Sequence, residues 1–241
     1  MSTQSEQASI VRERVSIRVA NENVTRLNNI EDRLNEIVAV ALANGMDRAK
    51  VISPEVIVVE KRAQAKCLIP RCTSYGKSLT CPPNMPETSE VKEIVSEYRH
   101  AVMMQVDGSE EADGTSELLR RDYNWCYESV YKLHEALHNC ETRAFNLGFY
   151  LAMGFGGGDC RWCELLGGGI EQYGEHALLH ANAGGCAGVR GGSCTQEYRA
   201  RPALEAMSVN VLATAANAGL PFYFSGADER YVTWNAIVLV D

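Results

Sequence analysis

Residues 55–106 carry the clearest fold signal of the chain and read EVIVVEKRAQAKCLIPRCTSYGKSLTCPPNMPETSEVKEIVSEYRHAVMMQV. The apolar run from Glu55 to Glu60 predicts a buried strand, and the run from Ala101 to Val106 predicts a second one. Between them lie a cysteine-rich loop, the prolines Pro82, Pro83 and Pro86, and a helix that we expect to begin near Thr88 or Ser89. Strand, loop, helix and strand in this order predict a fold of class α/β, built from βαβ units with cysteine-rich loops.

Helical spacing of apolar residues predicts two more helices. One spans Arg26–Ala43, with Gly45 placed to end it. The other is a long helix that ends near Gly148, and its apolar residues step by four and three. These residues are Cys126, Val130, Leu133, Leu137, Cys140, Ala144 and Leu147.

The rest of the chain predicts a strand that enters a second cysteine loop, then a helix and two closing strands. These elements are expected over Phe149–Phe155, Pro202–Ala218, Phe222–Phe224 and Trp234–Val240. The two halves of the chain share one plan, because in each a strand runs into a cysteine loop and a helix follows.

Two groups of cysteine residues lie far apart in the chain, each among glycine and proline. The first group is Cys67, Cys72 and Cys81. The second group is Cys160, Cys163, Cys186 and Cys194. Buried structural cysteine normally lies among aliphatic residues. Cysteine in a polar, glycine-rich loop is instead typical of a disulfide, a metal site or a redox reaction.

Length and composition favour metal binding over disulfides. A chain of 241 residues is long enough to build a hydrophobic core without disulfide cross-links, whereas disulfide-dense proteins are mostly small secreted domains. The opening MSTQSEQASIVRERVS has no apolar segment typical of a secretion signal, and the longest strongly apolar run, Ile37–Ala43, is too short to span a bilayer. We therefore expect a soluble cytoplasmic protein with reduced thiols and no membrane span. The net charge of −8 argues against nucleic acid as a partner.

The second cysteine group begins with the C-x2-C pair of Cys160 and Cys163. Zinc knuckles, iron–sulfur loops and thioredoxin-like redox pairs share this spacing. Cys186 and Cys194 add two sulfurs around a glycine-rich stretch, which gives four. Glycine lets backbone N–H groups point at an anionic centre, and an iron–sulfur cluster needs such donors more than zinc does. We interpret the four residues as ligands of a [4Fe-4S] cluster, with zinc as the alternative.

The first cysteine group has only three members nearby. Two prolines follow Cys81, and a cysteine followed by proline also ends the ferredoxin-type run. Three thiolates from Cys67, Cys72 and Cys81 leave one iron of a cubane free for water or substrate, as a catalytic cluster requires. The alternative is that a distant side chain completes the set, such as Cys126, Cys140 or a histidine.

Other residues that could carry chemistry have simpler interpretations. Cys126 and Cys140 lie on the apolar stripe of the long helix, where we expect small core residues. His176 and His180 stand at i, i+4, but no acidic residue is placed between them as in H-E-x-x-H, so a helix surface is the better interpretation. No P-loop, no G-x-G-x-x-G after a strand and no catalytic triad can be identified.

Three stretches, CTSYGKSLTCPP, GGGDCRWCE and CTQEYRARPALEAMSVNV, together resemble a family of predicted metal-binding proteins from anaerobic bacteria and methanogenic archaea. Members of that family look like C-x2-C-x2-Y-G-K…C-P-P near the start. Later they look like G-x-C-x2-C-x2-C, followed by a further cysteine and R-P-x-M-E-A-x-G-x-D-V. The matching residues are Cys72, Tyr75, Gly76, Lys77, Cys81, Pro82, Pro83, Cys160, Cys163, Cys194, Arg201, Pro202, Glu205, Ala206 and Val211. The resemblance covers the chain from Ile57 to Asp241 and implies iron–sulfur binding.

The chain departs from the family pattern at two places. Four residues separate Cys67 from Cys72, where the family commonly has two. The third cysteine expected after Cys163 is missing, and residues 164–185 intervene before Cys186. We infer that Cys186 replaces the missing ligand.

We therefore expect an α/β iron–sulfur domain over residues 51–241, preceded by an N-terminal helical extension over residues 1–50. Two [4Fe-4S] clusters would serve anaerobic redox metabolism, the second cysteine group as a closed electron relay and the first as a reactive centre or second relay. An iron–sulfur-dependent oxidoreductase or lyase is one outcome. The alternatives are an electron-transfer subunit of a larger oxidoreductase and a zinc-stabilised interaction module.

Two kinds of partner follow from these expectations. The first is a redox partner protein or a larger oxidoreductase. The second is a small anionic substrate, which Lys77 and Arg201 are placed to steer, and the same side chains could instead stabilise the reduced loops. For Lys77, a solvated surface charge is the competing interpretation.

Overall fold

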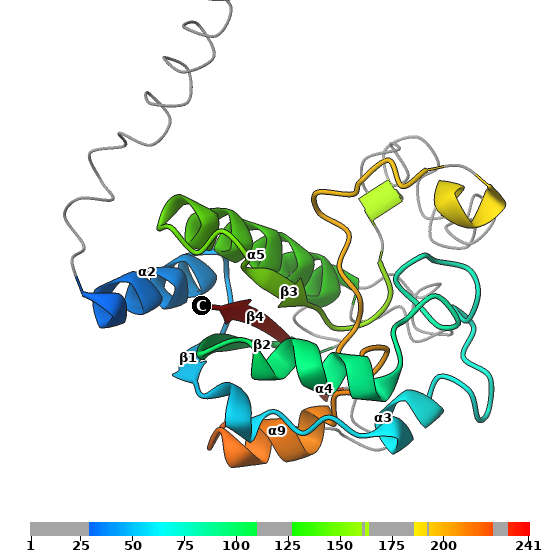
Figure 1. The fold of residues 1–241 in the computed structure, drawn as a ribbon, viewed down its shortest axis with the longest axis horizontal. Helices are drawn as coiled ribbons and strands as arrows, with labels where there is room; N and C mark the ends of the chain where they lie inside the picture. The colour runs from blue at the N-terminus through cyan, green and yellow to red at the C-terminus, as the bar shows by residue number, and fades with distance from the viewer. Residues whose placement is uncertain (1–28, 110–126, 161, 164–185, 192, 224–230) are drawn as a thin grey trace, which may run out of the picture.

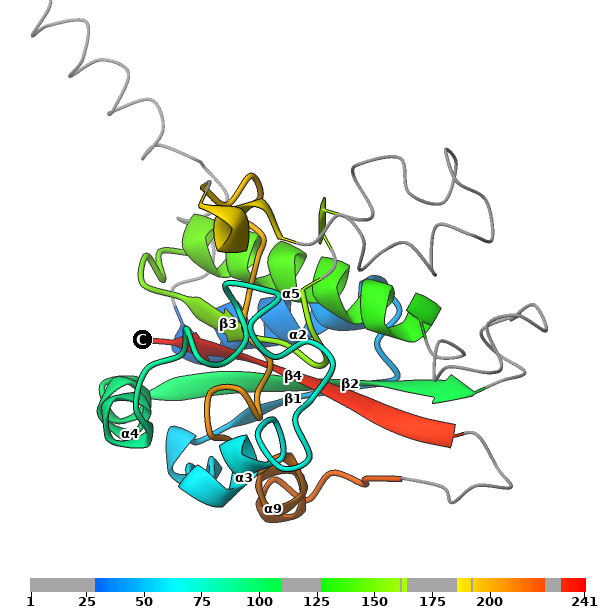
Figure 2. The same cartoon turned by 90° about the vertical axis from the view of Figure 1, so that its right-hand side faces the viewer.

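The computed structural model describes residues 29–109, 127–160, 162–163, 186–191, 193–223 and 231–241, which build three layers around a four-stranded sheet. α2 (Ile30–Ala43) and α5 (Tyr127–Asn146) cover one face of the sheet. α3 (Lys61–Ala65), α4 (Thr88–Ser96) and α9 (Val211–Asn217) lie on the other side (Figures 1 and 2). In this part of the chain, no helix combines the length and the apolar character needed to cross a bilayer.

Every pairing in the sheet is antiparallel, in the order β1-β2-β4-β3. β2 (His100–Ser109) and β4 (Tyr231–Val240) form the centre and pair along their full lengths. β1 (Arg48–Ile52) borders β2, and the short β3 (Met153–Phe155) borders β4. β3 ends opposite Ile237, so the chain leaves the sheet just before the second cysteine loop.

Both faces of the central strands are buried. On β2, Val102 and Met104 lie in the core under α2 and α5, whereas Ala101 and Met103 lie in the core under α4 and α9. The residues of β4 alternate between the same two cores. Neither face of these strands is left to water, so their sequences read as continuous apolar runs rather than as an alternating pattern.

The two long helices expected from the sequence are present. Asn29 caps α2, because its side-chain oxygen accepts a hydrogen bond from the Glu31 N–H group at 3.1 Å. Gly45 follows the helix with φ of +84°, a conformation that favours glycine. The stripe predicted for α5 is buried at each described position, namely Val130, Leu133, Leu137, Cys140, Ala144 and Leu147. Cys126 lies outside the described residues.

The predicted βαβ unit is wrong, because β1 and β2 are antiparallel neighbours. The predicted strand at Glu55–Glu60 is wrong as well. The Ser53 side chain accepts a hydrogen bond from the Glu55 N–H group at 3.3 Å, and Pro54 begins the short 3₁₀ helix η2 (Pro54–Val56). Val59 forms an isolated bridge to Val209 instead of joining the sheet, and β1 takes the place beside β2.

Other element boundaries also differ from the expectations. The strand expected at Phe149–Phe155 is reduced to β3, because turns after α5 take up its first residues. The helix expected at Pro202–Ala218 begins only at Val211, where the Asn210 side chain accepts a hydrogen bond from the Ala213 N–H group at 3.1 Å. Phe222 and Tyr223 form no strand, and Phe224 lies outside the described residues. The closing strand at Trp234–Val240 is confirmed within the longer β4, and the helix expected near Thr88 is confirmed as α4.

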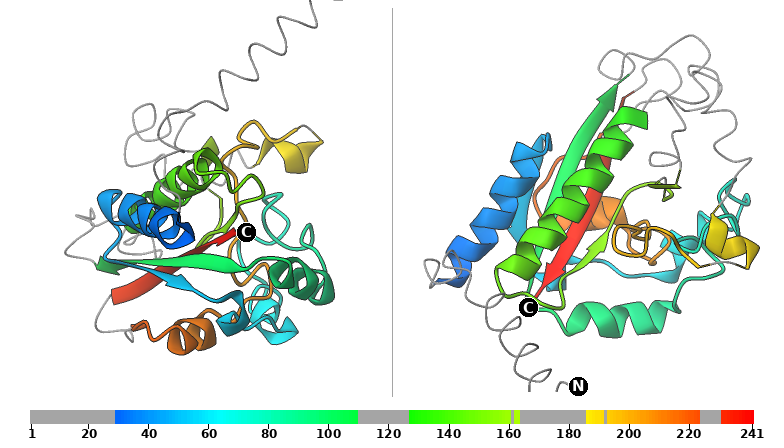
Figure 3. Two further views of the ribbon diagram at one scale, coloured as in Figure 1. Left: turned by 60° about the vertical axis from the view of Figure 1, so that its left-hand side comes forward. Right: turned by 90° about the horizontal axis from the view of Figure 1, so that it is seen from above.

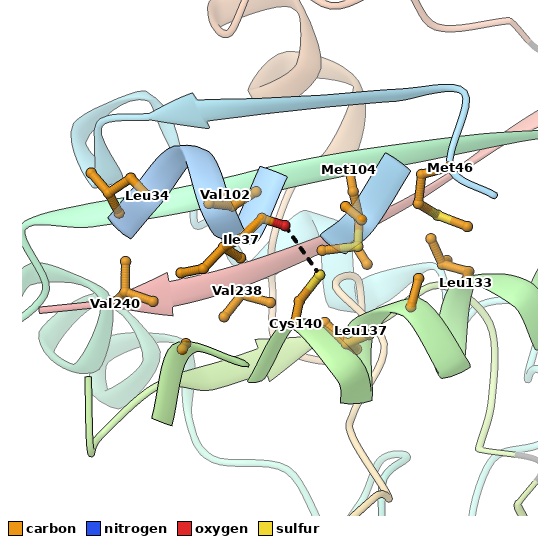
Figure 4. Close-up of a cluster of buried hydrophobic side chains, with 14 of the residues drawn as sticks. Leu34, Ile37, Met46, Val102, Met104, Leu133, Leu137, Cys140, Val238 and Val240 are labelled. Atoms are coloured by element: carbon orange, nitrogen blue, oxygen red, sulfur yellow. Dashed lines mark hydrogen bonds between the residues drawn. The ribbon is translucent and has the colours of Figure 1, made fainter. Parts of the chain in front are cut away.

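Cys140 is fully buried between α5 and α2, and its thiol donates a weak hydrogen bond to the Ile37 carbonyl oxygen, with an S···O distance of 3.6 Å (Figure 4). Burial, together with Glu141, raises the pKa of this thiol to about 12. Cys140→Ala is therefore expected to lower the free energy of unfolding by about 1 kcal/mol, because a small buried group is lost. Chemical denaturation measures this change. Loss of metal from the variant would contradict the assignment of Cys140 to the core.

Candidate metal centre

Turns directly after α3 form the first cysteine loop. The Cys72 amide donates a hydrogen bond to the Cys67 carbonyl oxygen at 3.1 Å. The Gly76 amide donates to the Pro82 carbonyl oxygen at 2.8 Å, and Gly76 has φ of +71°, which only glycine adopts without strain. These bonds fold the loop back on itself, with Cys72 exposed at its surface and Cys81 buried.

Backbone hydrogen bonds hold the second cysteine loop in place where it leaves β3. The Gly156 amide donates to the Pro202 carbonyl oxygen at 2.8 Å, and the Gly156 carbonyl oxygen accepts from the Leu204 amide at 2.8 Å. The start of this loop is therefore fixed to the segment that follows Cys194, the last cysteine of the second group.

Trp162 anchors the C-x2-C pair, because it lies between Cys160 and Cys163 in the chain and is only 5% exposed. Its indole N–H group donates to the Arg199 carbonyl oxygen at 2.9 Å. The guanidinium carbon of Arg199 lies 5.3 Å from the centroid of the Trp162 ring, which is a cation–π contact. The Cys163 thiol lies 3.6 Å from the Thr195 hydroxyl oxygen. These contacts join both ends of the second cysteine group.

The two cysteine loops lie side by side, as the cyan loop and the yellow 3₁₀ helix η6 (Ala187–Arg190) show in Figures 1 and 3. The Ser74 hydroxyl group donates a hydrogen bond to Asp159 Oδ2 at 2.9 Å, across 85 positions of sequence. The Cys186 amide donates to the Lys77 carbonyl oxygen at 3.4 Å. Direct bonds therefore connect the loop of the first group to both halves of the second.

The thiols of the first group interact with one another. Burial first, and then the negative charges of Asp159, Cys67, Cys72 and Cys160, together raise the pKa of the Cys81 thiol to about 12. Burial also raises the pKa of Cys67, with smaller contributions from Cys72 and from the carboxylate of Glu205. Cys67, Cys72 and Cys81 are therefore within electrostatic range of each other, and Cys81 is also within range of Cys160.

The thiols of the second group interact in the same way. Burial, with smaller contributions from the thiols of Cys163, Cys194 and Cys186, raises the pKa of Cys160 to about 12. A hydrogen bond from the Trp162 backbone N–H group to the Cys160 sulfur opposes it. The structure therefore brings the four residues of the second group near each other, and Cys160 also acts electrostatically on Cys81 of the first group.

The charge balance of these thiols fits a bound metal. No basic side chain of the described residues is among the main influences on the pKa of Cys81 or Cys160. A coordinating metal would supply the positive charge that lets several of these thiols ionise together. Thiolate ligands select soft metals and iron–sulfur clusters.

The thiols do not surround one point. Across the described ranges, no three His, Cys, Asp or Glu side chains converge closely enough to ligate a single ion. The thiolates of a multi-iron cluster bind different irons and lie farther apart than the ligands of one ion. Both cysteine groups therefore remain candidates for metal ligands.

Arg201, expected to steer a substrate or stabilise the loops, contacts the protein itself. Its Nε donates to Glu141 Oε1 at 2.7 Å, and the same oxygen accepts a hydrogen bond from the Gly154 amide at 2.8 Å. The guanidinium group also donates to three carbonyl oxygens within residues 197–200. Burial raises the pKa of Glu141, and Arg201 opposes this shift. Arg201 thus ties the segment after Cys194 to α5 and β3.

Arg201→Gln is expected to lower the free energy of unfolding by about 3 kcal/mol, because Glu141 would keep a buried charge without its cation. Arg143→Gln is the matched control. Arg143 pairs with Glu36 at 3.1 Å, but Glu36 is 41% exposed, so we expect a loss below about 1 kcal/mol. Denaturant titration measures both losses, and equal losses would contradict this role of Arg201.

Several features of the site could not be found from cysteine spacing. Trp162, Asp159 and Ser74 position the loops, and their only sequence signal is their place next to the cysteines. Lys77 is exposed, as expected for a solvated charge. Cys140 lies in the core under α2, away from both loops, so it does not complete the first group. Cys126, His176 and His180 lie outside the described residues.

Comparison with known proteins gives a family. A family model described as "Predicted metal-binding protein (DUF2284)" matches residues 50–240, which include both cysteine groups. No curated protein and no solved structure matches the chain.

Proposed function

The chain belongs to the predicted metal-binding protein family DUF2284, and on this premise we propose that it is a cytoplasmic iron–sulfur protein of anaerobic redox metabolism. Cys160, Cys163, Cys186 and Cys194 hold one [4Fe-4S] cluster. Cys67, Cys72 and Cys81 hold the other. When bound, such clusters supply one-electron transfer and, at an iron without a thiolate, Lewis-acid chemistry.

The observation that carries this proposal is the grouping of the thiols. Three thiols influence one another in the first loop and four in the second, and the two sets adjoin at Cys81 and Cys160. In the described ranges no basic side chain is among the main influences on Cys81 or Cys160, and an array of this size suits ligands that share the positive charge of several irons. The adjacency of the two sets also suits electron transfer from one to the other.

The two sets support different roles. Four thiolates close every position of a cubane, which suits an electron relay. Three thiolates leave one iron open, which suits the binding and reduction of a substrate. On this assignment the protein is an iron–sulfur-dependent oxidoreductase or lyase, with the first group as its reactive centre.

An electron-transfer subunit is the second candidate, and exposed apolar side chains near the cysteines favour it. Ile69 is 80% exposed in the first loop, and Tyr198 is 79% exposed after Cys194. Exposed apolar and aromatic side chains are typical of protein-binding surfaces. They would meet a redox partner protein or a larger oxidoreductase beside the clusters. A zinc-stabilised interaction module remains the third candidate, and metal analysis separates it from the other two.

The proposal is tested by electron paramagnetic resonance of anaerobically purified protein after reduction with dithionite. Because the two cysteine sets adjoin, two reduced clusters should broaden each other's signals by spin–spin interaction. In the Cys160→Ala variant the signal should simplify to that of one isolated cluster. A native spectrum from one isolated cluster, or no paramagnetic signal at all, would exclude the two-cluster assignment.

A further inference from the structure

A cavity of about 720 Å³ lies beside both cysteine loops. Lys66, the residue before Cys67, lines it, and so does Gly158, two positions before Cys160. Glu205 also lines it and acts electrostatically on the Cys67 thiol. A molecule held in this cavity therefore lies next to the first cysteine group.

Most of the wall is apolar. The apolar lining includes Ala63, Leu204, Val209, Val211, Phe222 and Trp234. A wall of this composition binds the hydrocarbon or aromatic part of a small molecule, and the few polar groups fix its orientation.

Several polar residues of the lining already have protein partners. Glu60 Oε1 accepts hydrogen bonds from Arg62 Nε and from Asn210 Nδ2, each at 2.6 Å. Asn235 Oδ1 accepts a hydrogen bond from Gln105 Nε2 at 2.9 Å. These contacts hold Glu60 Oε1, Arg62 Nε and Asn235 Oδ1 within the wall of the cavity.

Lys66 and Glu205 are the charged residues of the lining that form no ion pair with a described residue. Lys66 forms no ion pair with any described residue, and its positive charge acts electrostatically on Glu205. Burial raises the pKa of Glu205, whose carboxyl group bonds to its own backbone N–H group rather than to another side chain, and a nearby cation lowers that pKa again. One basic and one acidic side chain therefore stand at the cysteine end of a largely apolar cavity, and no salt bridge joins them.

We propose that this cavity binds a small zwitterion of the amino-acid type. Its carboxylate pairs with Lys66, its ammonium group pairs with Glu205, and its apolar side chain lies along the wall that contains Phe222 and Trp234. This inference rests on the proposed function, because the zwitterion would be the molecule that the cavity presents to the first cysteine group. Opposite charges at one end and apolar surface at the other match this class better than a simple acid or a simple amine.

The test uses calorimetric titration of the anaerobically purified full chain with L-phenylalanine, 3-phenylpropanoate and 2-phenylethylamine. These probes share an aromatic body but carry both charges, the carboxylate alone or the ammonium alone. L-Phenylalanine is expected to bind at least about tenfold more tightly than either analogue, because each analogue loses one charge-assisted contact. Equal affinities, or no binding of L-phenylalanine, would overturn the inference.

Two variants separate the cavity from general effects. Lys66→Gln is expected to weaken L-phenylalanine binding about tenfold and to leave 2-phenylethylamine binding unchanged. Lys61→Gln is the matched control, because Lys61 is exposed on α3 and does not line the cavity. Leu212 lies on α9, is 47% exposed and lines the cavity, so Leu212→Trp should fill part of the cavity and weaken the binding of all three probes. An unchanged affinity in Lys66→Gln and Leu212→Trp would overturn the inference.

Iron and sulfide are measured on the same samples, so that failure of the cavity site can be told apart from failure of the iron–sulfur function. Zwitterion-selective binding to protein without iron would sustain the cavity site and exclude the iron–sulfur function. Iron-loaded protein that does not select the zwitterion would sustain the iron–sulfur function and exclude the cavity site.

Discussion

Cys160→Ala is expected to halve the iron content of the anaerobically purified protein, from about eight to about four irons per chain. Cys160 belongs to the four-thiol set, and its thiol interacts with all three other members. Loss of one thiolate should release that cluster, whereas the first cysteine loop keeps its own turns and its own three thiols. Iron and acid-labile sulfide, measured together, report the loss.

Cys140→Ala is the matched control for this experiment. It removes the same thiol from a site in the core under α2, and we expect it to keep all iron. Cys81→Ala should remove the other cluster and also leave about four irons. If Cys160→Ala lost all its iron, the two sets would not assemble independently, and the separate assignment of the seven cysteines would fail.

Mild oxidation is expected to convert the first cluster to a three-iron form before the second cluster is damaged. Among the described residues three thiols act on one another in the first set, and Cys140 is ruled out as a fourth by its position in the core. An iron without a thiolate is the easiest to lose. Titration with ferricyanide, followed by electron paramagnetic resonance, should show a three-iron signal from about one cluster per chain.

Cyanide gives an independent test of the open iron. Added to the reduced protein, it should perturb the signal of the cluster on Cys67, Cys72 and Cys81 and leave the other signal unchanged. Variants that lack one cluster assign each signal to its loop. If both clusters resist cyanide and oxidant equally, the first set is fully ligated. The protein would then be an electron carrier rather than a catalyst.

The sheet topology could not be predicted from the sequence because both of its faces are covered. Ala101 to Val106 is apolar throughout, since alternate residues enter two different cores. Such a run is typical of parallel strands between helices, and we predicted βαβ units from it. Only the long-range pairing of β2 with β4 decides the direction, and that pairing joins segments more than 100 residues apart, which local patterns do not report.

Helices with a strong apolar stripe could be predicted from the sequence, whereas the secondary structure of a short apolar run could not. The stripe of α5 repeats over several turns and is buried as predicted at its described positions. The run Glu55–Glu60 is equally apolar, but Pro54 starts a 3₁₀ turn and only Val59 bridges another segment. Short apolar runs of this kind do not distinguish a strand from an irregular buried segment.

The cysteine groups were predictable because ligand spacing is a local property of the sequence. The residues that connect the groups were not, because their contacts depend on tertiary structure. The Ser74–Asp159 hydrogen bond joins two loops that no local pattern relates. The same holds for Glu205, whose place beside Cys67 follows from the fold.

Iron, acid-labile sulfide and zinc, measured per chain on protein purified without oxygen, test the central claim most directly. Two cubanes predict about eight irons, about eight sulfides and no stoichiometric zinc. About one zinc per chain with no sulfide would contradict the account and would identify the cysteine loops as a zinc-stabilised interaction module.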